Sequence, residues 1–308
     1  MANKWAYAIF LIIGLAILSF LIAGFIGVMI GFSSGDYTST GNVMLISLSG
    51  PISNQPTQGI ISTETSTSSF MLEKLKNAKE DPTIEAVVIS IDSPGGGAVA
   101  SHKVVEAMKK LDKPSVTVIQ SMGASGAYWV ASASDMIYAD PLSMIGSIGV
   151  TSSYLEVSDL LKDYNITYER LVSGDFKDAG SPLRSLEDEE RAVLQRQLDR
   201  VHEIFIEDVA DNRDLSDPQM ENVSDGRVFL GDESIELGLI DKLGGLDDAK
   251  SHLEDELNIS VRFRKAKRST SMFPFLSGVR KDFAFNFGRG FASWLTEDET
   301  SGEMISLR

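Results

Sequence analysis

The stretch Ser115-Val-Thr-Val-Ile-Gln-Ser-Met-Gly-Ala-Ser-Gly-Ala-Tyr128 joins a run typical of a β-strand to a run typical of a helix. Val116 to Ile119 are all β-branched, and small apolar residues follow Ser125. A serine at such a junction meets free backbone N–H groups and the positive end of a helix dipole, which is what acyl transfer requires. We therefore predict that Ser125 is a nucleophile, while the simpler interpretation of a serine at this position is a helix N-cap.

A lysine is the predicted base for Ser125. Histidine is poorly placed for this role, because the three histidines of the chain are His102, His202 and His252. Lys177 follows a strand-like run, Thr167 to Val172, and lies between Gly174 and Gly180. It can act as a base near neutral pH only if burial lowers its pKa by several units from about 10.4. The simpler interpretation of Lys177 is a charge in solvent.

Three consecutive glycines provide a candidate oxyanion hole. The run Glu85-Ala-Val-Val-Ile-Ser-Ile-Asp92 is typical of a buried parallel strand, and Ser93-Pro-Gly-Gly-Gly97 leads from it into a helical pattern. Glycines leave backbone N–H groups uncovered, so we expect the N–H groups of Gly96 and Gly126 to stabilise an oxyanion. A flexible turn or a phosphate loop are the alternatives, but neither common phosphate motif fits this stretch.

Five motifs, taken together, resemble the signal peptide peptidase A family over roughly Val43 to Lys250. They are Asp92-Ser-Pro-Gly-Gly-Gly97, Ser121-Met-Gly with Ala124-Ser-Gly126, Gly146-Ser-Ile-Gly-Val150, Ser173-Gly-Asp-Phe-Lys-Asp178, and Asp225-Gly-Arg-Val228 through Gly238-Leu-Ile-Asp241 with Gly244-Gly245. Many members carry a longer stretch where Gly123 here runs directly into Ala124.

The resemblance implies a serine protease of the ClpP/crotonase superfamily, an α/β fold of repeated ββα units. It implies Ser125 as nucleophile, Lys177 as general base and Ser147 as a hydroxyl that orients the lysine. It also implies a homo-oligomeric ring or dome in which neighbouring subunits complete each Ser/Lys dyad, and it implies no cofactor.

Alternating apolar patterns predict a parallel sheet with helical crossovers. The predicted strands are Val43–Leu48, Ala86–Ile91, Ser115–Ile119, Met136–Ala139, Thr167–Val172 and Ile259–Phe263. The predicted helices are Phe70–Lys79, Ala98–Leu111, Ser125–Ala133, Val157–Leu161, Leu186–Ala210 and Leu246–Leu257.

The N-terminus is predicted to anchor the chain in a membrane. Ala6 to Phe32 is an uncharged apolar run of about 27 residues, long enough to cross the hydrocarbon core and too long for a cleaved signal peptide. Lys4 precedes this run and Asp36 follows it, so the positive-inside tendency places the domain after it outside the cytoplasm. We expect a single-pass anchor (1–35), a protease domain (36–268) and an aromatic-rich tail (269–308).

Composition restricts the remaining classes of function. The formal net charge of −16 disfavours nucleic acid as a partner, and the absence of cysteine excludes a thiol nucleophile. No His or Cys cluster indicates a metal site. The sequence thus predicts a membrane-anchored serine endopeptidase that degrades apolar peptides such as signal-peptide remnants; the alternative is a membrane-tethered scaffold of the same fold without catalysis.

Overall fold

The computed structural model describes residues 13–24, 41–54 and 66–266. By its internal contacts the chain divides into two units, Met1–Ala266 and Lys267–Arg308, and the second lies wholly outside the described residues. The predicted aromatic-rich tail falls in that second unit.

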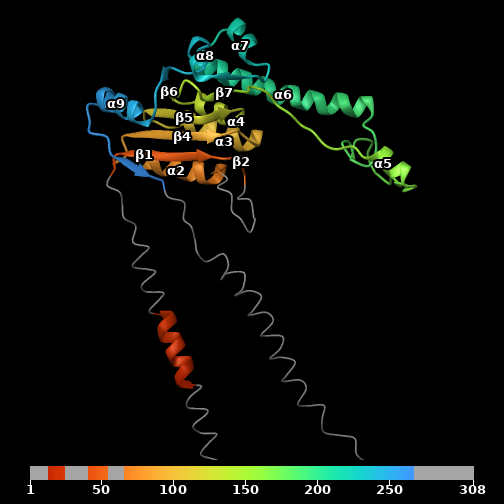
Figure 1. Ribbon diagram of the computed structural model, residues 1–308, viewed down its shortest axis with the longest axis horizontal. Coiled ribbons are helices and arrows are strands. Elements are labelled where there is room, and N and C mark those ends of the chain that lie inside the picture. The colour runs from red at the N-terminus through yellow and green to blue at the C-terminus, as the bar shows by residue number, and fades with distance from the viewer. Residues whose placement is uncertain (1–12, 25–40, 55–65, 267–308) are drawn as a thin grey trace, which may run out of the picture. The chain divides into compact units, whose positions relative to one another are not determined.

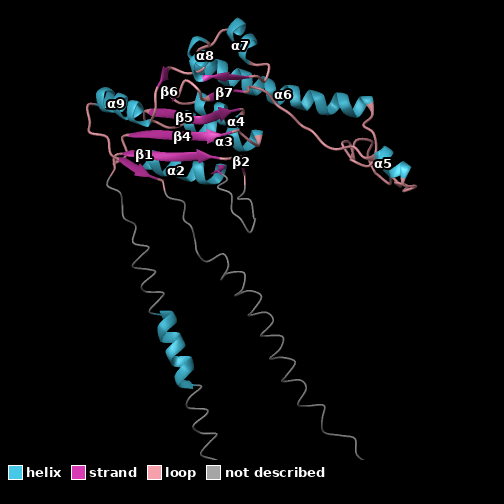
Figure 2. Ribbon diagram, viewed as in Figure 1, coloured by secondary structure: helices cyan, strands magenta, loops and turns pink. Residues whose placement is uncertain are grey.

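A mixed α/β fold surrounds one large sheet, in which the described residues contribute eight strands (Figures 1 and 2). Six strands lie side by side in the order β10-β1-β4-β5-β6-β9, and all of these pairs are parallel. Their bounds are β1 Val43–Ser49, β4 Ala86–Ser93, β5 Ser115–Ala124, β6 Met136–Ala139, β9 Lys242–Leu243 and β10 Phe263–Lys265.

The longest strand, β5, changes partner along its length. Its first half pairs with β6, and its last residues, Met122 to Ala124, pair with β7 (Met144–Gly146). β7 also pairs antiparallel with β8 (Val228–Leu230). A separate parallel pair is formed by β2 (Ile52–Ser53) and β3 (Ser66–Thr67). The change of partner brings β7 and the residues after it to the carboxyl end of β5.

Helices cover both faces of the sheet. Most of them belong with the larger core: α2 Ser68–Glu80, α3 Ala98–Lys109, α4 Gly126–Ser132, α6 Asp188–Arg213 and α7 Asp217–Val223. The smaller core lies under α9, Leu246–Leu257, which contributes Ala249 and Leu253. Two further helices of this unit are α5 Ser158–Asp163 and α8 Gly231–Glu236.

Alternation along β4 explains why both faces need cover. Val87, Ile89 and Ile91 belong to the larger core, whereas Ala86 and Val88 belong to the smaller one. Successive side chains of a strand point to opposite faces, so a strand that is apolar throughout requires helices on both sides. The sheet rich in parallel strands agrees with the predicted fold class.

Two predicted strands are wrong. Residues 167–172 form no strand; they lie in an irregular stretch in which Leu171 is 94% exposed. A strand needs a neighbour to satisfy its backbone groups, and none of the described strands pairs with this stretch. The last strand, β10, is Phe263–Lys265 instead of Ile259–Phe263, because the register with β1 begins at Phe263.

The predicted membrane span is described only in part. Residues 13–24 are helical, and the rest of Ala6 to Phe32 lies outside the described residues. Among the helices that are described, none is both long and apolar enough to span a bilayer. The anchor therefore stays a prediction.

Candidate active site

Ser125 lies in a sharp turn between β5 and α4. Its backbone has φ 53° and ψ −129°, a conformation that a residue with a side chain rarely adopts. Such strain costs of the order of 1–3 kcal/mol and persists only where the surroundings fix it. A strained serine between a strand and a helix is the geometry of a nucleophile elbow, although the sequence around Ser125 lacks the usual final glycine of that motif.

Backbone hydrogen bonds hold the Ser125 turn from both sides. The Ser125 N–H donates to the carbonyl oxygen of Gly146 at 2.8 Å, and the Trp129 N–H donates to the Ser125 carbonyl at 3.0 Å. The first bond is possible because β5 pairs with β7 at this point. The serine therefore does not act as an ordinary N-cap, since its side chain makes no capping hydrogen bond.

Gly96 and Gly126 come together beside Ser125. A Cβ built on Gly126 would lie 3.5 Å from the Gly96 nitrogen. Gly126 is the first residue of α4, so its N–H has no partner within the helix. Gly96 forms a parallel β-bridge with Ile52. In this bridge the Ile52 N–H donates to the Gly95 carbonyl, and the Gly97 N–H donates to the Ile52 carbonyl. In such a bridge the N–H of the central residue, Gly96, points away from the partner.

The loop before α3 packs directly against the serine turn, and this role of Gly95 was missed by the sequence analysis. Gly95 has φ +92°, and a Cβ there would lie 2.7 Å from the Gly126 nitrogen and 2.9 Å from the Ser125 Cβ. Only glycine fits such a backbone and such an approach. The run of three glycines was the available signal, but it did not indicate which glycine contacts the serine.

Ser147 follows the glycine whose carbonyl binds Ser125. It also has a positive φ, 51°, and its N–H donates to the Arg227 carbonyl at 2.8 Å. Ser125 and Ser147 are both half-buried. The structure therefore brings together four of the five predicted site residues: Ser125, Gly96, Gly126 and Ser147.

A cavity of about 230 Å³ opens at the serine. Its lining includes Ser125, Gly96, Gly126, Trp129, Val150 and Phe205. The Trp129 and Phe205 rings stack with centroids 4.5 Å apart, and both side chains are almost fully buried. The Trp129 indole N–H also donates to Asp208 at 2.9 Å. The apolar floor of this cavity was not predicted from the sequence, because Phe205 lies 80 residues after Ser125, within the predicted helix Leu186–Ala210.

Lys177 is not part of this cavity. It lies on an exposed turn, residues 173–180, which we call the lysine turn. Among the described residues, every hydrogen bond between residues 152–187 and the rest of the chain goes to Glu190 or Arg191, at the start of α6. We call residues 152–187 the α5 segment; Figure 1 shows α5 near the N-terminal end of α6.

The length of α6 keeps the lysine turn and the serine of one chain apart. Glu190 holds the lysine turn, while Phe205, 15 residues later in the same helix, packs at the serine cavity. At 1.5 Å per residue these two positions are about 22 Å apart along the helix axis. A single chain in this conformation therefore does not form the predicted Ser125–Lys177 dyad.

The structure does not bring a histidine or a metal-binding group to the serine as an alternative to the lysine, among the residues that it describes. His202 lies in α6 with its Nε2 3.2 Å from the Ile148 carbonyl oxygen, next to Ser147. In the part of the chain that the structure describes, His, Asp and Glu side chains form no group able to hold a metal ion.

Comparison with known proteins places this site in a family. Residues 107–260, half of the chain, match the model of peptidase family S49. A protein of Methanocaldococcus jannaschii named as a protease is 31% identical over 66% of this chain. A protein of Enterococcus faecium named for signal peptide peptidase SppA is 32% identical over 72% of this chain, and the chloroplast serine protease SPPA of Arabidopsis thaliana is 30% identical over 75%.

The matched stretches cover 66%, 65% and 34% of the lengths of these three relatives. The match contains the predicted nucleophile, base and lysine-orienting serine, since residues 107–260 include Ser125, Ser147 and Lys177. The chain therefore belongs to peptidase family S49 and resembles the proteases named for SppA.

Proposed function

We propose that this protein is a membrane-anchored serine endopeptidase with Ser125 as nucleophile and Lys177 as general base. The strained backbone of Ser125 beside the Gly96 and Gly126 N–H groups is the observation that carries the proposal. Backbone strain of this kind gathers at active sites, and here it places the serine at a cavity in front of backbone donors.

The reaction follows from these groups. Lys177 Nζ takes the proton of the Ser125 hydroxyl as Oγ attacks the scissile carbonyl carbon. The N–H groups of Gly96 and Gly126 stabilise the tetrahedral oxyanion. Its collapse breaks the C–N bond, and the leaving amine takes the proton from Lys177. Water then hydrolyses the acyl-enzyme, with the same lysine as base and Ser147 orienting it.

The lysine in each working site would come from a neighbouring copy of the chain. This is supported by the separation along α6 and by the exposed apolar side chains of the α5 segment, which a single chain leaves uncovered. Those at least half exposed are Leu155, Leu160, Tyr164, Ile166 and Leu171. A neighbour that covers this surface would also remove water from Lys177, and a lysine acts as a base only when it is shielded from water in this way. Assembly is thus a condition of activity.

Apolar peptides such as signal-peptide remnants are the proposed substrates. The cavity at Ser125 has an aromatic floor that suits an apolar side chain. The predicted anchor would hold the site near the membrane, with the protease domain on the extracytoplasmic side, where such remnants remain in the bilayer.

Peptide hydrolysis by the full chain in detergent micelles tests the proposal. The wild type should cleave a fluorogenic apolar peptide, and Ser125→Ala and Lys177→Ala should each lower kcat by more than about 10³-fold. Equal activity in the wild type and Lys177→Ala would reject the lysine as base. A wild type that assembles without cleaving any peptide would favour the scaffold.

Mixing the two inactive variants tests where the lysine comes from. When Ser125→Ala and Lys177→Ala chains are dissociated and reassembled in equal amounts, about a quarter of the head-to-tail contacts pair an intact serine with an intact lysine. We expect about that fraction of wild-type activity to return. Mixtures that stay inactive while forming mixed assemblies would place both residues of the dyad in one chain.

A further inference from the structure

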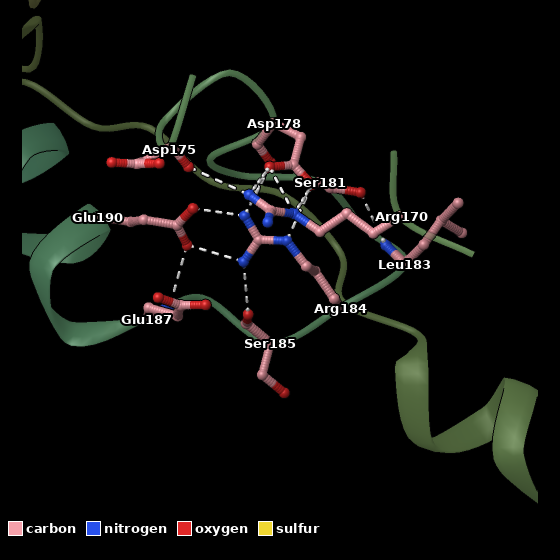
Figure 3. A network of polar contacts seen from close by, with 9 residues as sticks. All are labelled: Arg170, Asp175, Asp178, Ser181, Leu183, Arg184, Ser185, Glu187 and Glu190. Carbon is pink, nitrogen blue, oxygen red and sulfur yellow. Dashed lines mark hydrogen bonds and ion pairs between the residues drawn. The ribbon is translucent and has the colours of Figure 1, made fainter. Parts of the chain in front are cut away.

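The lysine turn is held by a compact network of charges, shown in Figure 3. Asp178, the residue after Lys177, receives hydrogen bonds from two arginines that approach from opposite ends of the turn. Arg170 donates to it through Nη2 at 2.7 Å and Nε at 2.9 Å, and Arg184 donates through Nε and Nη2, both at 2.9 Å. Arg170 also binds the Asp175 carbonyl at 3.1 Å, which closes the turn on itself.

Arg184 connects the lysine turn to α6. Its Nη1 donates to the Glu190 carboxylate at 2.8 Å, and its Nη2 binds the second oxygen of the same carboxylate. Glu190 also accepts the Glu187 N–H at 3.0 Å, so it caps the helix at the same time. The side chains of Arg184 and Asp178 are 15% exposed and that of Glu190 only 3%.

Apart from short-range backbone hydrogen bonds, such as that of the Lys177 N–H to the Gly174 carbonyl at 3.1 Å, the described lysine turn has few contacts besides those of the arginines. Gly174 and Gly180 both have positive φ, +96° and +82°, and a Cβ on either would meet no atom within 4 Å. Phe176 is 48% exposed, so the turn has no apolar anchor in a single chain. Without the arginine contacts, a turn flanked by glycines in open space would take many conformations.

We propose that Arg184, held between Asp178 and Glu190, positions the turn that carries Lys177 and so aligns the general base with the serine of the neighbouring site. Asp178, Arg184 and Glu190 are positioning residues, because none of them touches the reacting atoms. The inference rests on the proposed function of Lys177. Two-pronged contacts of a guanidinium with carboxylates fix direction as well as distance, which a lysine at position 184 would not do.

The charge state of the network supports this role. The Arg184 and Arg170 guanidinium groups hold the pKa of the Asp178 carboxyl well below its usual range, and Arg184 lowers the pKa of Glu190. Asp178 and Glu190 therefore stay ionised in the neutral range and keep their hold on the two arginines. The other acidic side chains beside the turn are those of Asp175 and Glu187.

Steady-state kinetics of the full chain in detergent test the proposal with Arg184→Gln and Arg184→Lys. We expect kcat to fall about 10- to 100-fold in Arg184→Gln with KM changed less than about 2-fold, because a base displaced by about 1 Å loses rate and not substrate binding. We also expect the acid limb of the pH–rate profile to move to higher pH, since a loosened Lys177 regains water. Arg184→Lys keeps the positive charge but cannot make the two-pronged contacts of a guanidinium. Its kcat should therefore lie between that of Arg184→Gln and that of the wild type.

Arg200→Gln is the matched control. Arg200 also lies in α6 and binds Glu203 at 3.0 Å, but its side chain is 61% exposed and faces no residue of the lysine turn in the described structure. Its kcat and its acid limb should equal those of the wild type. A loss in Arg200→Gln as large as in Arg184→Gln would overturn the proposal, as would a wild-type kcat in Arg184→Gln.

Glu190→Gln provides a second route if Arg184→Gln does not fold. It keeps the shape of the side chain and the acceptor for the Glu187 N–H, and we expect the same loss of kcat and the same shift of the acid limb. If all these variants fail to assemble although they fold, the network acts on assembly and the proposal is wrong.

Lys177→Ala distinguishes a failure of the proposed function from a failure of the positioning role. If Lys177→Ala is fully active, the proposed function has failed. If Lys177→Ala is inactive and Arg184→Gln is fully active, only the positioning role is rejected.

Discussion

At the scale of residues, close backbone packing around Ser125 restricts the neighbouring positions Gly95 and Gly96 to glycine. Ser125 has a backbone conformation that costs free energy, and the neighbouring loop approaches so closely that a methyl group at Gly95 or Gly96 would overlap backbone atoms. The overlap is most severe at Gly96, where a Cβ would lie 2.1 Å from the Ile52 carbonyl oxygen. The oxyanion donors are therefore positioned by close backbone packing.

Gly96→Ala and Gly97→Ala form a matched pair that tests this packing. A Cβ on Gly97 would lie 3.9 Å from its nearest neighbours, and Gly97 has an ordinary φ of −61°. We expect Gly96→Ala to lower the free energy of unfolding by about 1–3 kcal/mol or more through the overlap. Gly97→Ala, which changes a helix N-cap, should lose about 1 kcal/mol or less.

Thermal unfolding followed by tryptophan fluorescence measures the difference, because Trp129 is buried in the core next to this loop. Equal midpoints for the two variants would show that the loop moves aside and that the close approach does not constrain it.

At the scale of residues, the sequence predicted the place of Ser125 between a strand and a helix but not the surroundings of the lysine. The place of Ser125 was predictable because a strand pattern and a small-residue helix pattern meet at it. Both patterns are local, and the folded chain keeps the strand and the helix. Lys177 also carried a recognisable motif. A lysine base needs burial, but Lys177 is exposed in a single chain, and no local pattern of the sequence encodes that exposure.

At the scale of elements, α6 connects the two halves of the proposed machinery. Its first turn binds the lysine turn through Glu190, and Phe205 and Asp208 near its other end bind Trp129 of α4, the helix that begins directly after Ser125. Asp208 also binds Lys109 of α3 at 2.5 Å, so three helices meet at one carboxylate. A change in this contact should affect the whole domain.

Phe205→Ala tests the contact between α6 and α4. Phe205 is 2% exposed and stacks on Trp129, so its removal leaves a cavity and should cost about 3–5 kcal/mol of unfolding free energy. Arg196→Ala, on an exposed face of the same helix, should change it by no more than about 0.5 kcal/mol. Urea unfolding of both proteins measures the values; a cost below 1 kcal/mol for Phe205→Ala would mean that α6 is not held by this stack.

Acid should loosen the α5 segment before the core. The pKa values of Asp178 and Glu190 are lowered by arginine from their ordinary values of 3.8 and 4.5. A lowered pKa adds stability that is present above the ordinary value and is lost as the pH falls towards the folded value. Between pH 4 and pH 2 the contacts of Arg184 should therefore weaken.

Pepsin cleavage of the inactive Ser125→Ala chain at pH 4 and pH 2, with the products mapped by mass spectrometry, checks this. New cuts should fall first in residues 152–187, and Glu190→Gln should show them already at pH 4. First cuts within β4 or β5 would instead mean that acid acts on the core.

Element predictions succeeded where the chain packs on itself. α9 was predicted with its observed bounds, Leu246–Leu257, because its apolar stripe meets the sheet. The strand predicted over 167–172 is wrong: apolar residues such as Leu171 and Val172 mimic the pattern of a buried strand, although both are exposed in a single chain. An apolar pattern shows which side chains favour burial. It does not show whether they are buried within the same chain or against another molecule.

At the scale of the whole molecule, the proposed assembly would bring strongly acidic chains together. The formal net charge is −16, so copies repel one another at low salt. The exposed apolar side chains of the α5 segment favour association, and their effect does not depend on screening. Raising salt from 0.1 to 1 M shortens the screening length from about 10 to about 3 Å, which should strengthen assembly.

Sedimentation of the full chain in detergent at the two salt concentrations tests this balance. We expect the concentration at which half of the chains are assembled to fall as salt rises. If salt leaves that concentration unchanged, repulsion between copies does not limit assembly.

Activity should depend on protein concentration if each site needs two chains. Well above the assembly midpoint the specific activity should be constant, and below it the specific activity should fall as the complexes dissociate. A released chain keeps Ser125, but its lysine turn is bound at Glu190, about 22 Å along α6 from Phe205 at the serine cavity. A dilution series of the wild type, with peptide hydrolysis and sedimentation measured on the same samples, gives both curves, and their midpoints should coincide.

Leu171→Asp tests the same dependence, because it places a charge at the most exposed apolar side chain of the α5 segment. This variant should move both midpoints together to higher protein concentration. Specific activity that stays constant through complete dissociation would show that one chain suffices, and the lysine turn would then have to reach its own serine by bending α6.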